Sequence, residues 1–339
     1  KRLVEGVYNV VAVVTQPDKP VGRHQDTLQP SQVKQYAVEH GLPVLQPVKM
    51  KDPEFVEQLR SYQADLQVVV AFRMLPEVVW AMPKFGTFNV HAALLPQYRG
   101  AAPINWAVIN GEKETGVTTF FLDHDIDTGR IIMQKRFPIP ESADVEYVYD
   151  GLMHLGADLA LETIDALIAA GGNIESMPQE KLIGEGVELK SAPKIFKETC
   201  RIDFHKPAKQ VYDFVRGLSP YPGSWTEIKK KAPVVIFEDA DGEMPKATAH
   251  PAQQKSAAKI QVLKIFKTSL TEFSRGVAPV GSLRVFEKKL QVACLDHWLN
   301  IEELQLSGKK RMDAAAFLNG MKDIAYYECQ KAQETEEEW

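Results

Sequence analysis

The stretch GTFNVHAALLPQYRGAAPINWAVING, residues 86–111, decides the fold class of this chain. It opens with a strand-like run, continues through a loop that contains proline and glycine, and ends in a helical pattern closed by Gly111. A strand, a short loop and a helix in this order form the repeating unit of sheets whose strands alternate with helices. Asn89 and His91 are two residues apart, so a strand would present both side chains on one face.

The same alternation of strand and helix extends to both sides of this stretch. Short apolar runs rich in valine predict buried strands, and polar N-cap residues followed by periodic apolar positions predict helices. The elements predicted in this way are strands at 9–16, 65–72, 116–123 and 129–139 and helices at 31–41, 52–62 and 145–170. In the last helix, an apolar stripe is predicted at Val148, Leu152, Leu155 and Leu159.

This order of elements predicts an α/β fold: a doubly wound, Rossmann-like domain with a mostly parallel sheet. Ligands of such sheets bind beyond the carboxyl ends of the strands, where Asn89 and His91 are expected to lie. A doubly wound domain normally opens with a strand, a turn and a helix. Here the opening residues KRLVEGVYN, 1–9, look like the end of a helix that runs into the second strand. We therefore expect the N-terminal strand to be missing.

The pattern changes near residue 190. The segment KSAPKIFKETCRIDF, 190–204, is polar and mixed, which is typical of a linker. After one helix at 207–218, short runs separated by turn residues predict a small antiparallel β-barrel of the OB-like kind, or a sandwich. These runs are 234–237, 258–266, 281–287, 289–296 and 298–306. The predicted organisation is an α/β domain over 1–189, a linker over 190–205, a β-barrel over 206–320 and an acidic tail over 321–339.

Composition narrows the class of protein. The chain has 339 residues, 45% hydrophobic and 25% charged, which indicates a globular protein too long for one ordinary core. No apolar run approaches the roughly 18 residues of a membrane-spanning helix, and residues 1–20 lack the apolar segment of a signal peptide. The three cysteines are far apart, which argues against a disulfide framework. We expect a monomeric, cytoplasmic protein with no membrane partner.

Charge is distributed unevenly between the two predicted domains. Residues 1–205 carry 20 Lys+Arg and 27 Asp+Glu, whereas residues 206–339 carry 20 and 18. Two basic runs, 229–231 and 309–311, lie in the second domain. A basic domain beside an acidic one indicates a polyanionic partner for the basic domain. Lysines that only solvate surface turns are the alternative, and charge alone leaves this alternative open.

Three polar residues are candidates for chemistry. His91 is the natural proton carrier, because imidazole titrates near neutral pH. Asn89 adds a neutral hydrogen-bond donor on the same strand face. Asp127 follows a buried strand in DHDIDTG, 123–129, and could orient the imidazole and favour its charged form. A lone core histidine and a turn aspartate are the alternatives that local sequence leaves open.

Other motifs give weaker signals. The alternating aspartates of 123–127 resemble a calcium loop, but Thr128 and Gln134 stand where glycine and glutamate are required. No Walker A loop and no HExxH motif is present. In PQYRGAAP, Arg99 and Gly100 precede a helix whose backbone amides could hold a loop or an anionic group. An Arg99 that merely pins the loop is an equally good interpretation.

Three stretches resemble the formyltransferase family that uses 10-formyltetrahydrofolate, and within it the enzymes that act on methionyl-tRNA. The first runs from FNVHAALLPQYRGAAPINW to DHDIDTG and places an Asp-x-Gly 36 residues after His91. The second is TQPDKPVGR, 15–23, and the third comprises APKIFKETCRIDF, 192–204, and LQLSGKKRM, 304–312. The resemblance covers nearly the whole chain except the acidic tail, but the family's first strand and its GTPxFA turn are absent.

The resemblance implies transfer of a formyl group from N10 of a folate to an amine. Asn89 and protonated His91 would donate hydrogen bonds to the formyl oxygen, and Asp127 would stabilise the imidazolium and help to remove the amine proton. No metal is implied. The folate-binding residues would be Phe72, Met74, Leu75, Asp123, His124 and Asp125, with Arg99 and Gly100 supporting the loop.

The resemblance also implies that the acceptor is methionyl initiator tRNA. Arg23, in the loop 18–26, would contact the acceptor end of the tRNA. Lys309, Lys310 and Arg311 would contact its phosphate backbone. Two other functions stay open: a formyltransferase that acts on a sugar-nucleotide amine, and a truncated chain that binds folate or RNA without catalysis.

Overall fold

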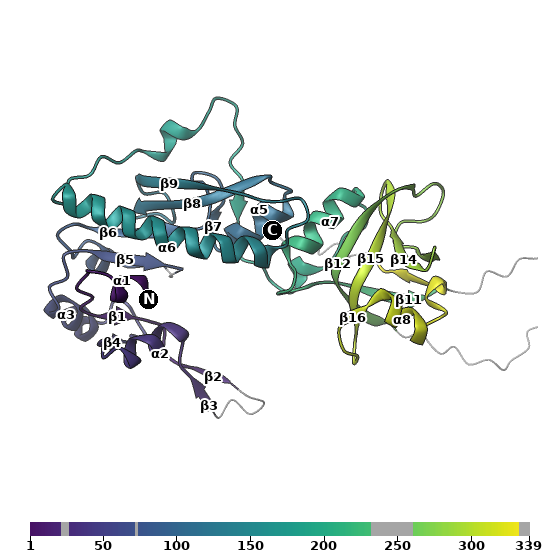
Figure 1. Cartoon of the computed structure of the whole chain (residues 1–339), viewed down its shortest axis with the longest axis horizontal. Coiled ribbons are helices and arrows are strands. Elements are labelled where there is room, and N and C mark those ends of the chain that lie inside the picture. Colours follow the sequence, from purple (N-terminus) through teal and green to yellow (C-terminus); the bar gives the residue numbers. More distant parts are fainter. Residues whose placement is uncertain (22–26, 72–73, 232–259, 332–339) are drawn as a thin grey trace, which may run out of the picture. The chain divides into compact units, whose positions relative to one another are not determined.

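The computed structural model describes residues 1–21, 27–71, 74–231 and 260–331 (Figure 1). The chain divides into two compact units. Unit 1 comprises Lys1–Ile104, Lys113–Glu141 and Tyr147–Lys194, and unit 2 comprises Asn105–Glu112, Ser142–Glu146 and the chain from Ile195 onward.

Unit 1 is built around a four-stranded sheet with the order β5-β6-β8-β9. Strands β5 (Gln67–Val70) and β6 (Thr87–His91) pair in parallel. Strand β8 (Glu114–Phe121) is antiparallel to β6, and β9 (Ile131–Pro138) is antiparallel to β8. A direct loop connects β8 to β9, and a connection of this kind joins antiparallel strands, which accounts for the antiparallel pairing of these two strands. The predicted Rossmann-like α/β class is confirmed, with its parallel pairing in the earlier strands and antiparallel strands at one edge.

Helix α6 (Val145–Ala169) runs along one face of this sheet (Figure 1). In the predicted apolar stripe of this helix, Leu155 is half-buried. The other three side chains are buried: Val148, Leu152 and Leu159. Ile164 and Leu167 of the helix form one buried cluster with Phe88 of β6. This packing fixes β6, the strand that carries Asn89 and His91.

The N-terminal part of unit 1 adds a second parallel pair. The elements here are α1 (Arg2–Glu5), β1 (Val13–Val14), α2 (Gln32–Glu39), β4 (Val44–Leu45) and α3 (Pro53–Ser61), with β1 and β4 parallel. Both predicted N-caps are confirmed, because the side chains of Ser31 and Asp52 accept hydrogen bonds from backbone N–H groups in the first turns of α2 and α3. The strand expected at 9–16 is shorter than predicted and covers only two residues.

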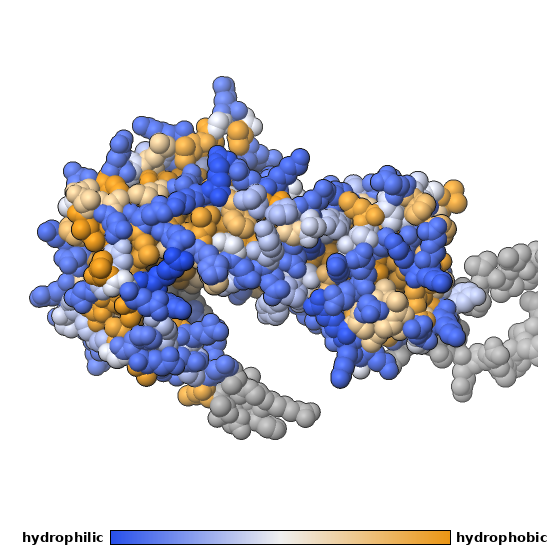
Figure 2. All heavy atoms as spheres, viewed as in Figure 1, coloured by the Kyte–Doolittle hydropathy of each residue, from blue (hydrophilic) through white to orange (hydrophobic). Residues whose placement is uncertain are grey.

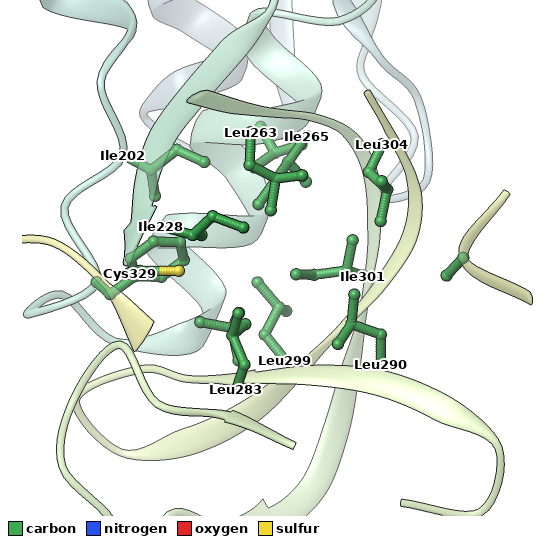
Figure 3. Packing of buried hydrophobic residues seen from close by; sticks show 14 of the residues in the cluster. Ile202, Ile228, Leu263, Ile265, Leu283, Leu290, Leu299, Ile301, Leu304 and Cys329 are labelled. Atoms are coloured by element: carbon green, nitrogen blue, oxygen red, sulfur yellow. The ribbon is translucent and has the colours of Figure 1, made fainter. Parts of the chain in front are cut away.

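Unit 2 contains an antiparallel sheet with the order β13-β14-β15-β12-β11-β17, and a bridge between Ser282 and Glu328 connects its two ends. Its strands are β11 (Ser224–Lys230), β12 (Gln261–Ser274), β13 (Leu283–Phe286), β14 (Lys289–Ala293), β15 (His297–Leu306), β16 (Met312–Asp313) and β17 (Tyr327–Cys329). Ile228, Leu263 and Leu299 point into the enclosed core (Figure 3). The predicted small barrel is therefore confirmed.

Strands β11 and β17 of the barrel are not among the runs predicted from the sequence. Strand β11 was not predicted, because its buried positions include the polar residues Ser224 and Thr226, which hide the apolar alternation. Strand β17 pairs with β11 and lies beyond residue 320, where a tail was expected to begin. The run predicted as a strand at 234–237 lies outside the described residues.

The remaining α-helices of the described residues are α4 (Glu77–Trp80), α5 (Pro103–Ile109), α7 (Ala208–Gly217) and α8 (Ala314–Gly320). No helix in the described part of the chain is long and apolar enough to cross a membrane. Hydrophilic residues cover much of the surface visible in Figure 2, with apolar side chains between them. The three cysteines are free and buried, and burial raises the pKa of the Cys329 thiol to about 12.

Candidate active site

The carboxyl end of β6 carries Asn89 and His91. In the sheet, Asn89 stands opposite Val69 of β5 and Phe120 of β8, so hydrogen-bonded neighbours hold the strand on both sides. Its Oδ1 atom is buried and has no hydrogen-bond partner among the described residues. Because buried polar atoms normally have partners, this unpartnered oxygen at the end of the sheet leaves the amide of Asn89 suited to a ligand.

The imidazole of His91 is held at one nitrogen and faces a carboxylate with the other. Its Nε2 lies 2.8 Å from the carbonyl oxygen of Tyr98. A carbonyl only accepts, so this contact assigns a hydrogen to Nε2. Nδ1 lies 3.7 Å from Oδ2 of Asp127, and the two side chains are only 6% and 12% exposed. Nδ1 is therefore the nitrogen that can accept or give a proton within the site.

Asp127 is brought to His91 by the turn that follows β8. Its Oδ2 accepts a hydrogen bond of 3.0 Å from the backbone N–H of Gly100. Its backbone has a φ of +57°, a left-handed conformation that non-glycine residues adopt rarely. The loop after β6 and the turn after β8 thus meet at one carboxylate, close to the imidazole.

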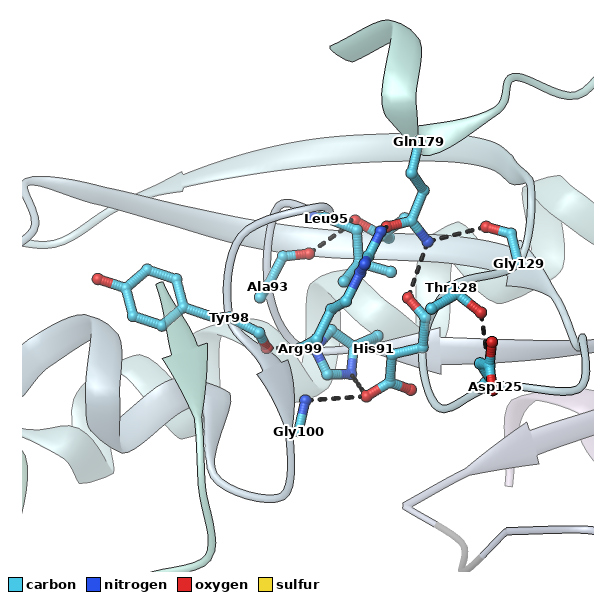
Figure 4. Close-up of polar contacts among 12 residues, drawn as sticks. His91, Ala93, Leu95, Tyr98, Arg99, Gly100, Asp125, Thr128, Gly129 and Gln179 are labelled. Atoms are coloured by element: carbon cyan, nitrogen blue, oxygen red, sulfur yellow. Dashed lines mark hydrogen bonds and ion pairs between the residues drawn. The ribbon is translucent and has the colours of Figure 1, made fainter. Parts of the chain in front are cut away.

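A buried glutamine that the sequence did not single out joins these two loops. Gln179 begins the short 3-10 helix η1 (Gln179–Leu182) and is fully buried. Its Oε1 accepts from the Nε and Nη2 of Arg99 at 3.0 and 2.7 Å. Its Nε2 donates to the carbonyls of Asp127 and Gly129 at 2.8 Å each. Figure 4 shows Arg99 reaching toward Gln179, with His91 and Gly100 below.

The loop is also held by the chain that leaves the domain. Arg99 and Gly100 form β7 (Arg99–Gly100), which pairs in parallel with β10 (Ser191–Ala192). Tyr98 donates its N–H to the carbonyl of Lys190 at 2.7 Å. The start of the expected linker therefore belongs to the framework of the site, and its pairing with β7 holds Arg99 and Gly100 in place.

The expected folate-binding residues lie on two neighbouring segments. Among them Met74 is exposed, Leu75 is half-buried, and Asp123, His124 and Asp125 are exposed, whereas Phe72 lies outside the described residues. Helix α4 (Glu77–Trp80) follows the first segment. His124 approaches this helix, with its Nδ1 3.9 Å from Oε2 of Glu77 and its ring 5.5 Å from that of Trp80. The structure therefore brings the loop 123–125 next to the segment that begins at residue 74.

The sequence matches the Formyl transferase family over residues 2–164 and the Formyl transferase C-terminal domain over residues 194–322. The methionyl-tRNA formyltransferase of Parabacteroides distasonis is 55% identical over 96% of this chain and 93% of that protein. The chain belongs to the formyl transferase family.

Two further similarities agree with this membership. The methionyl-tRNA formyltransferase of Phocaeicola vulgatus is 57% identical over 94% of this chain and 90% of that protein. A solved structure of WlaRD, a sugar 3N-formyl transferase in the presence of dTDP and 5-N-formyl-THF, has a TM-score of 0.55 and 18% identity. It covers 91% of this chain and 92% of that chain, and this likeness concerns the fold.

In this formyl transferase, the residues expected to bind tRNA are spread over both units. Strands β2 (Lys19–Val21) and β3 (Thr27–Gln29) form an antiparallel ribbon, and Arg23 between them lies outside the described residues. Asp18, before β2, accepts hydrogen bonds from Lys34 and Gln46. The hydrogen bond from Lys34 lowers the pKa of the Asp18 carboxyl. The ribbon is therefore anchored at its base.

In the barrel, Lys309 and Lys310 are exposed on the turn after β15. Arg311 differs from them, because its guanidinium donates to both carboxylate oxygens of Glu303 and lies 4.2 Å over the ring of Phe266. These contacts hold Arg311 against the barrel, and the Glu303 partner raises the pKa of the Arg311 guanidinium. In the run 229–231, Lys230 forms an ion pair of 2.9 Å with Asp323.

Within the described ranges, no group of three or more His, Cys, Asp or Glu side chains is arranged to hold a metal.

Replacing Gly100 by alanine is expected to disturb this formyl transferase site. A Cβ on Gly100 would lie 2.4 Å from the carbonyl oxygen of Ala192, and its φ of +127° is strained for any other residue. Strands β7 and β10 would have to separate, which would displace the N–H that binds Asp127. We expect a loss of about 2–4 kcal/mol in the free energy of unfolding and a roughly tenfold or greater loss of kcat.

Thermal unfolding and the rate of formyl transfer measure the two effects. Gly41→Ala is the matched control, because Gly41 has a φ of +66° but nothing lies within 4 Å of its added Cβ. The control should lose only about 1 kcal/mol of stability and no activity. If Gly100→Ala behaved like this control, the pairing of β7 and β10 would not matter for the site.

Proposed function

We propose that this chain transfers a formyl group from 10-formyltetrahydrofolate to the amino group of methionyl initiator tRNA, for translation initiation. The observation that carries the proposal is the meeting of His91 and Asp127 at the end of β6, beside the unpartnered side-chain oxygen of Asn89, in a chain that matches both domains of the formyl transferases. The relatives named above support methionyl-tRNA rather than a sugar nucleotide as the acceptor.

The geometry supports a direct attack of the amine on the formyl carbon. A bond forms between the amine nitrogen and the formyl carbon, and negative charge collects on the formyl oxygen. The side-chain amide of Asn89 and a protonated Nδ1 of His91 would donate hydrogen bonds to this oxygen. The bond from the carbon to N10 of the folate then breaks, and N10 leaves with the proton that the amine has given up.

Asp127 would assist by its charge and as a proton acceptor. At 3.7 Å from Nδ1, its carboxylate attracts a charged imidazole without a tight hydrogen bond. The N–H at Nδ1 of His91 is then available to donate to the formyl oxygen. The proton lost by the amine would pass to Asp127, directly or through water. Orientation and charge stabilisation are what such an acyl transfer requires, so the proposed mechanism uses no metal.

The two substrates would contact different residues of the chain. The pterin of the folate would lie near Met74 and Leu75, with the loop 123–125 at its edge. Arg23 would contact the acceptor end of the tRNA, and Lys309 and Lys310 its phosphates. We further propose that the protein acts in the cytoplasm as a monomer.

Formyl transfer is tested directly with the purified protein, 10-formyltetrahydrofolate and charged initiator tRNA. The expected result is N-formylmethionyl-tRNA as the product, measured by acid gel or mass spectrometry. Offering an amino-sugar nucleotide in place of the tRNA tests the second acceptor class. Transfer to the sugar nucleotide alone would contradict the proposal, and binding of both substrates without any transfer would favour a non-catalytic role.

Removing two barrel lysines should weaken tRNA binding without altering the chemistry. In Lys309→Ala/Lys310→Ala, we expect the Kd for tRNA to rise about tenfold and the slope of log K against log salt to fall by about 2, because each lysine is proposed to neutralise one phosphate. Filter binding at several salt concentrations measures both. Lys49→Ala/Lys51→Ala removes two exposed lysines of unit 1 and should leave the slope unchanged. Equal slopes for the two variants would remove Lys309 and Lys310 from the tRNA interface.

A further inference from the structure

We infer that Gln179 is a positioning residue for formyl transfer, and that it holds the Asp127 carboxylate toward His91 by fixing the backbone of the turn 127–129. The inference rests on the proposed function, since it gives Gln179 a part in that reaction. Gln179 comes from η1, which follows α6 and lies about 50 residues from the turn that it binds.

The hydrogen-bonding capacity of Gln179 is fully used. A side-chain amide has two N–H donors and two acceptor lone pairs. Here Nε2 donates to two backbone carbonyls and Oε1 accepts twice from the guanidinium of Arg99. The side chain is 0% exposed. It therefore has no polar atom left for a substrate, and any effect on the reaction must pass through the groups that it holds.

The turn that Gln179 holds is one that needs support. Asp127 has a left-handed backbone, a conformation that persists only where the surroundings impose it. Two residues later, Gly129 lies so close to β8 that a Cβ would come within 1.6 Å of the carbonyl oxygen of Phe121. By binding the carbonyls on both sides of Thr128, the amide of Gln179 fixes the turn between these two constraints.

Gln179 also connects the two anchors of the Asp127 carboxylate. The first anchor is the N–H of Gly100, which donates to Oδ2 of Asp127. The second is the hydrogen bond from Nε2 of Gln179 to the backbone carbonyl of Asp127. Arg99, next to Gly100, donates twice to the same glutamine. Both loops are thus set by one buried amide, which fixes the direction of the carboxylate and hence its 3.7 Å approach to Nδ1 of His91.

The first variant, Gln179→Met, keeps the volume of the side chain and removes all four hydrogen bonds. We expect kcat to fall about 30- to 100-fold with the KM values for tRNA and folate within about threefold, because a catalytic group displaced by about 1 Å costs roughly this factor. Gln179→Glu keeps the acceptor for Arg99 and loses only the donors to the turn. Its second carboxylate oxygen would face the carbonyls of Asp127 and Gly129 without a proton to donate, so it should also lose kcat. Thermal unfolding shows which of the two variants is folded, and that variant decides the test.

A double-mutant cycle separates positioning from general structural support. If Gln179 acts through Asp127, adding Gln179→Met to Asp127→Asn should lower kcat by no more than about threefold further. The matched control is Gln291→Met in unit 2. Gln291 is 1% exposed, and its amide also lies between an arginine, Arg284, and a second partner, Asn300. This control should lose thermal stability and keep kcat.

The outcomes are distinguishable in a single assay of formylated tRNA. A wild-type protein that transfers no formyl group would overturn the proposed function, and this inference with it. An active wild type whose Gln179 variants keep kcat within about twofold would overturn the inference alone. A double-mutant cycle in which the effects of the two substitutions on kcat multiply would also overturn the inference, because Gln179 would then not act through Asp127.

Discussion

Replacing His91 by alanine is expected to lower kcat for formyl transfer by about 10³-fold or more, with little change in the KM values for folate and tRNA. In the proposed mechanism Nδ1 of His91 supplies one of the two hydrogen bonds to the developing oxyanion, and it is the only imidazole nitrogen available. The other nitrogen, Nε2, is bound to the carbonyl of Tyr98. Truncation therefore removes the donor and leaves the Asp127 carboxylate without its cationic partner.

Steady-state kinetics with each substrate in turn measure this loss. His154→Ala is a suitable control, because His154 is an exposed histidine of α6 and lies outside the proposed machinery. It should retain full activity. Thermal unfolding of His91→Ala should be recorded beside the kinetics, since the loss of one buried hydrogen bond costs only about 1 kcal/mol. An active His91→Ala protein would exclude the imidazole from the mechanism.

The part of the site that depends on local rules could be predicted from the sequence. Asn89 and His91 are two residues apart, so both side chains lie on the same face of the strand. Because strands alternate with helices in this part of the sequence, the carboxyl end of the strand is expected at the ligand-binding edge of the sheet. The approach of Asp127 could not be derived from its own neighbours. It depends on the pairing of β8 with β6, which brings a residue 36 positions away to the end of the same strand. The family resemblance, rather than local pattern, indicated that approach.

Gln179 and β11 show where sequence patterns lose their information. Gln179 sits in a polar stretch without periodicity, and its complete burial arises only when η1 folds over the turn after β8. In β11, polar Ser224 and Thr226 face inward, because their hydroxyl groups can be satisfied inside the barrel, as Ser224 is by the carbonyl of Ile265. Hydrophobic alternation cannot reveal polar groups that tertiary contacts bury.

Replacing Asp127 by asparagine should separate the charge of this residue from its shape. We expect kcat to fall by about 10⁴-fold, because neutralising a carboxylate beside a catalytic imidazole has an effect of this order. Stability should be unchanged or slightly higher, because asparagine tolerates the left-handed backbone that Asp127 adopts. The amide oxygen can still accept the N–H of Gly100, so the loops should remain joined.

The comparison with Asp127→Ala completes the argument. Alanine removes the acceptor for Gly100 and has no side chain to ease a φ of +57°, so it should lose both activity and about 1–2 kcal/mol of stability. Kinetics and thermal unfolding of the two variants therefore give different pairs of results. An asparagine variant with near-normal kcat would mean that the hydrogen bond from Gly100, and not the negative charge beside His91, is what the reaction requires of this position.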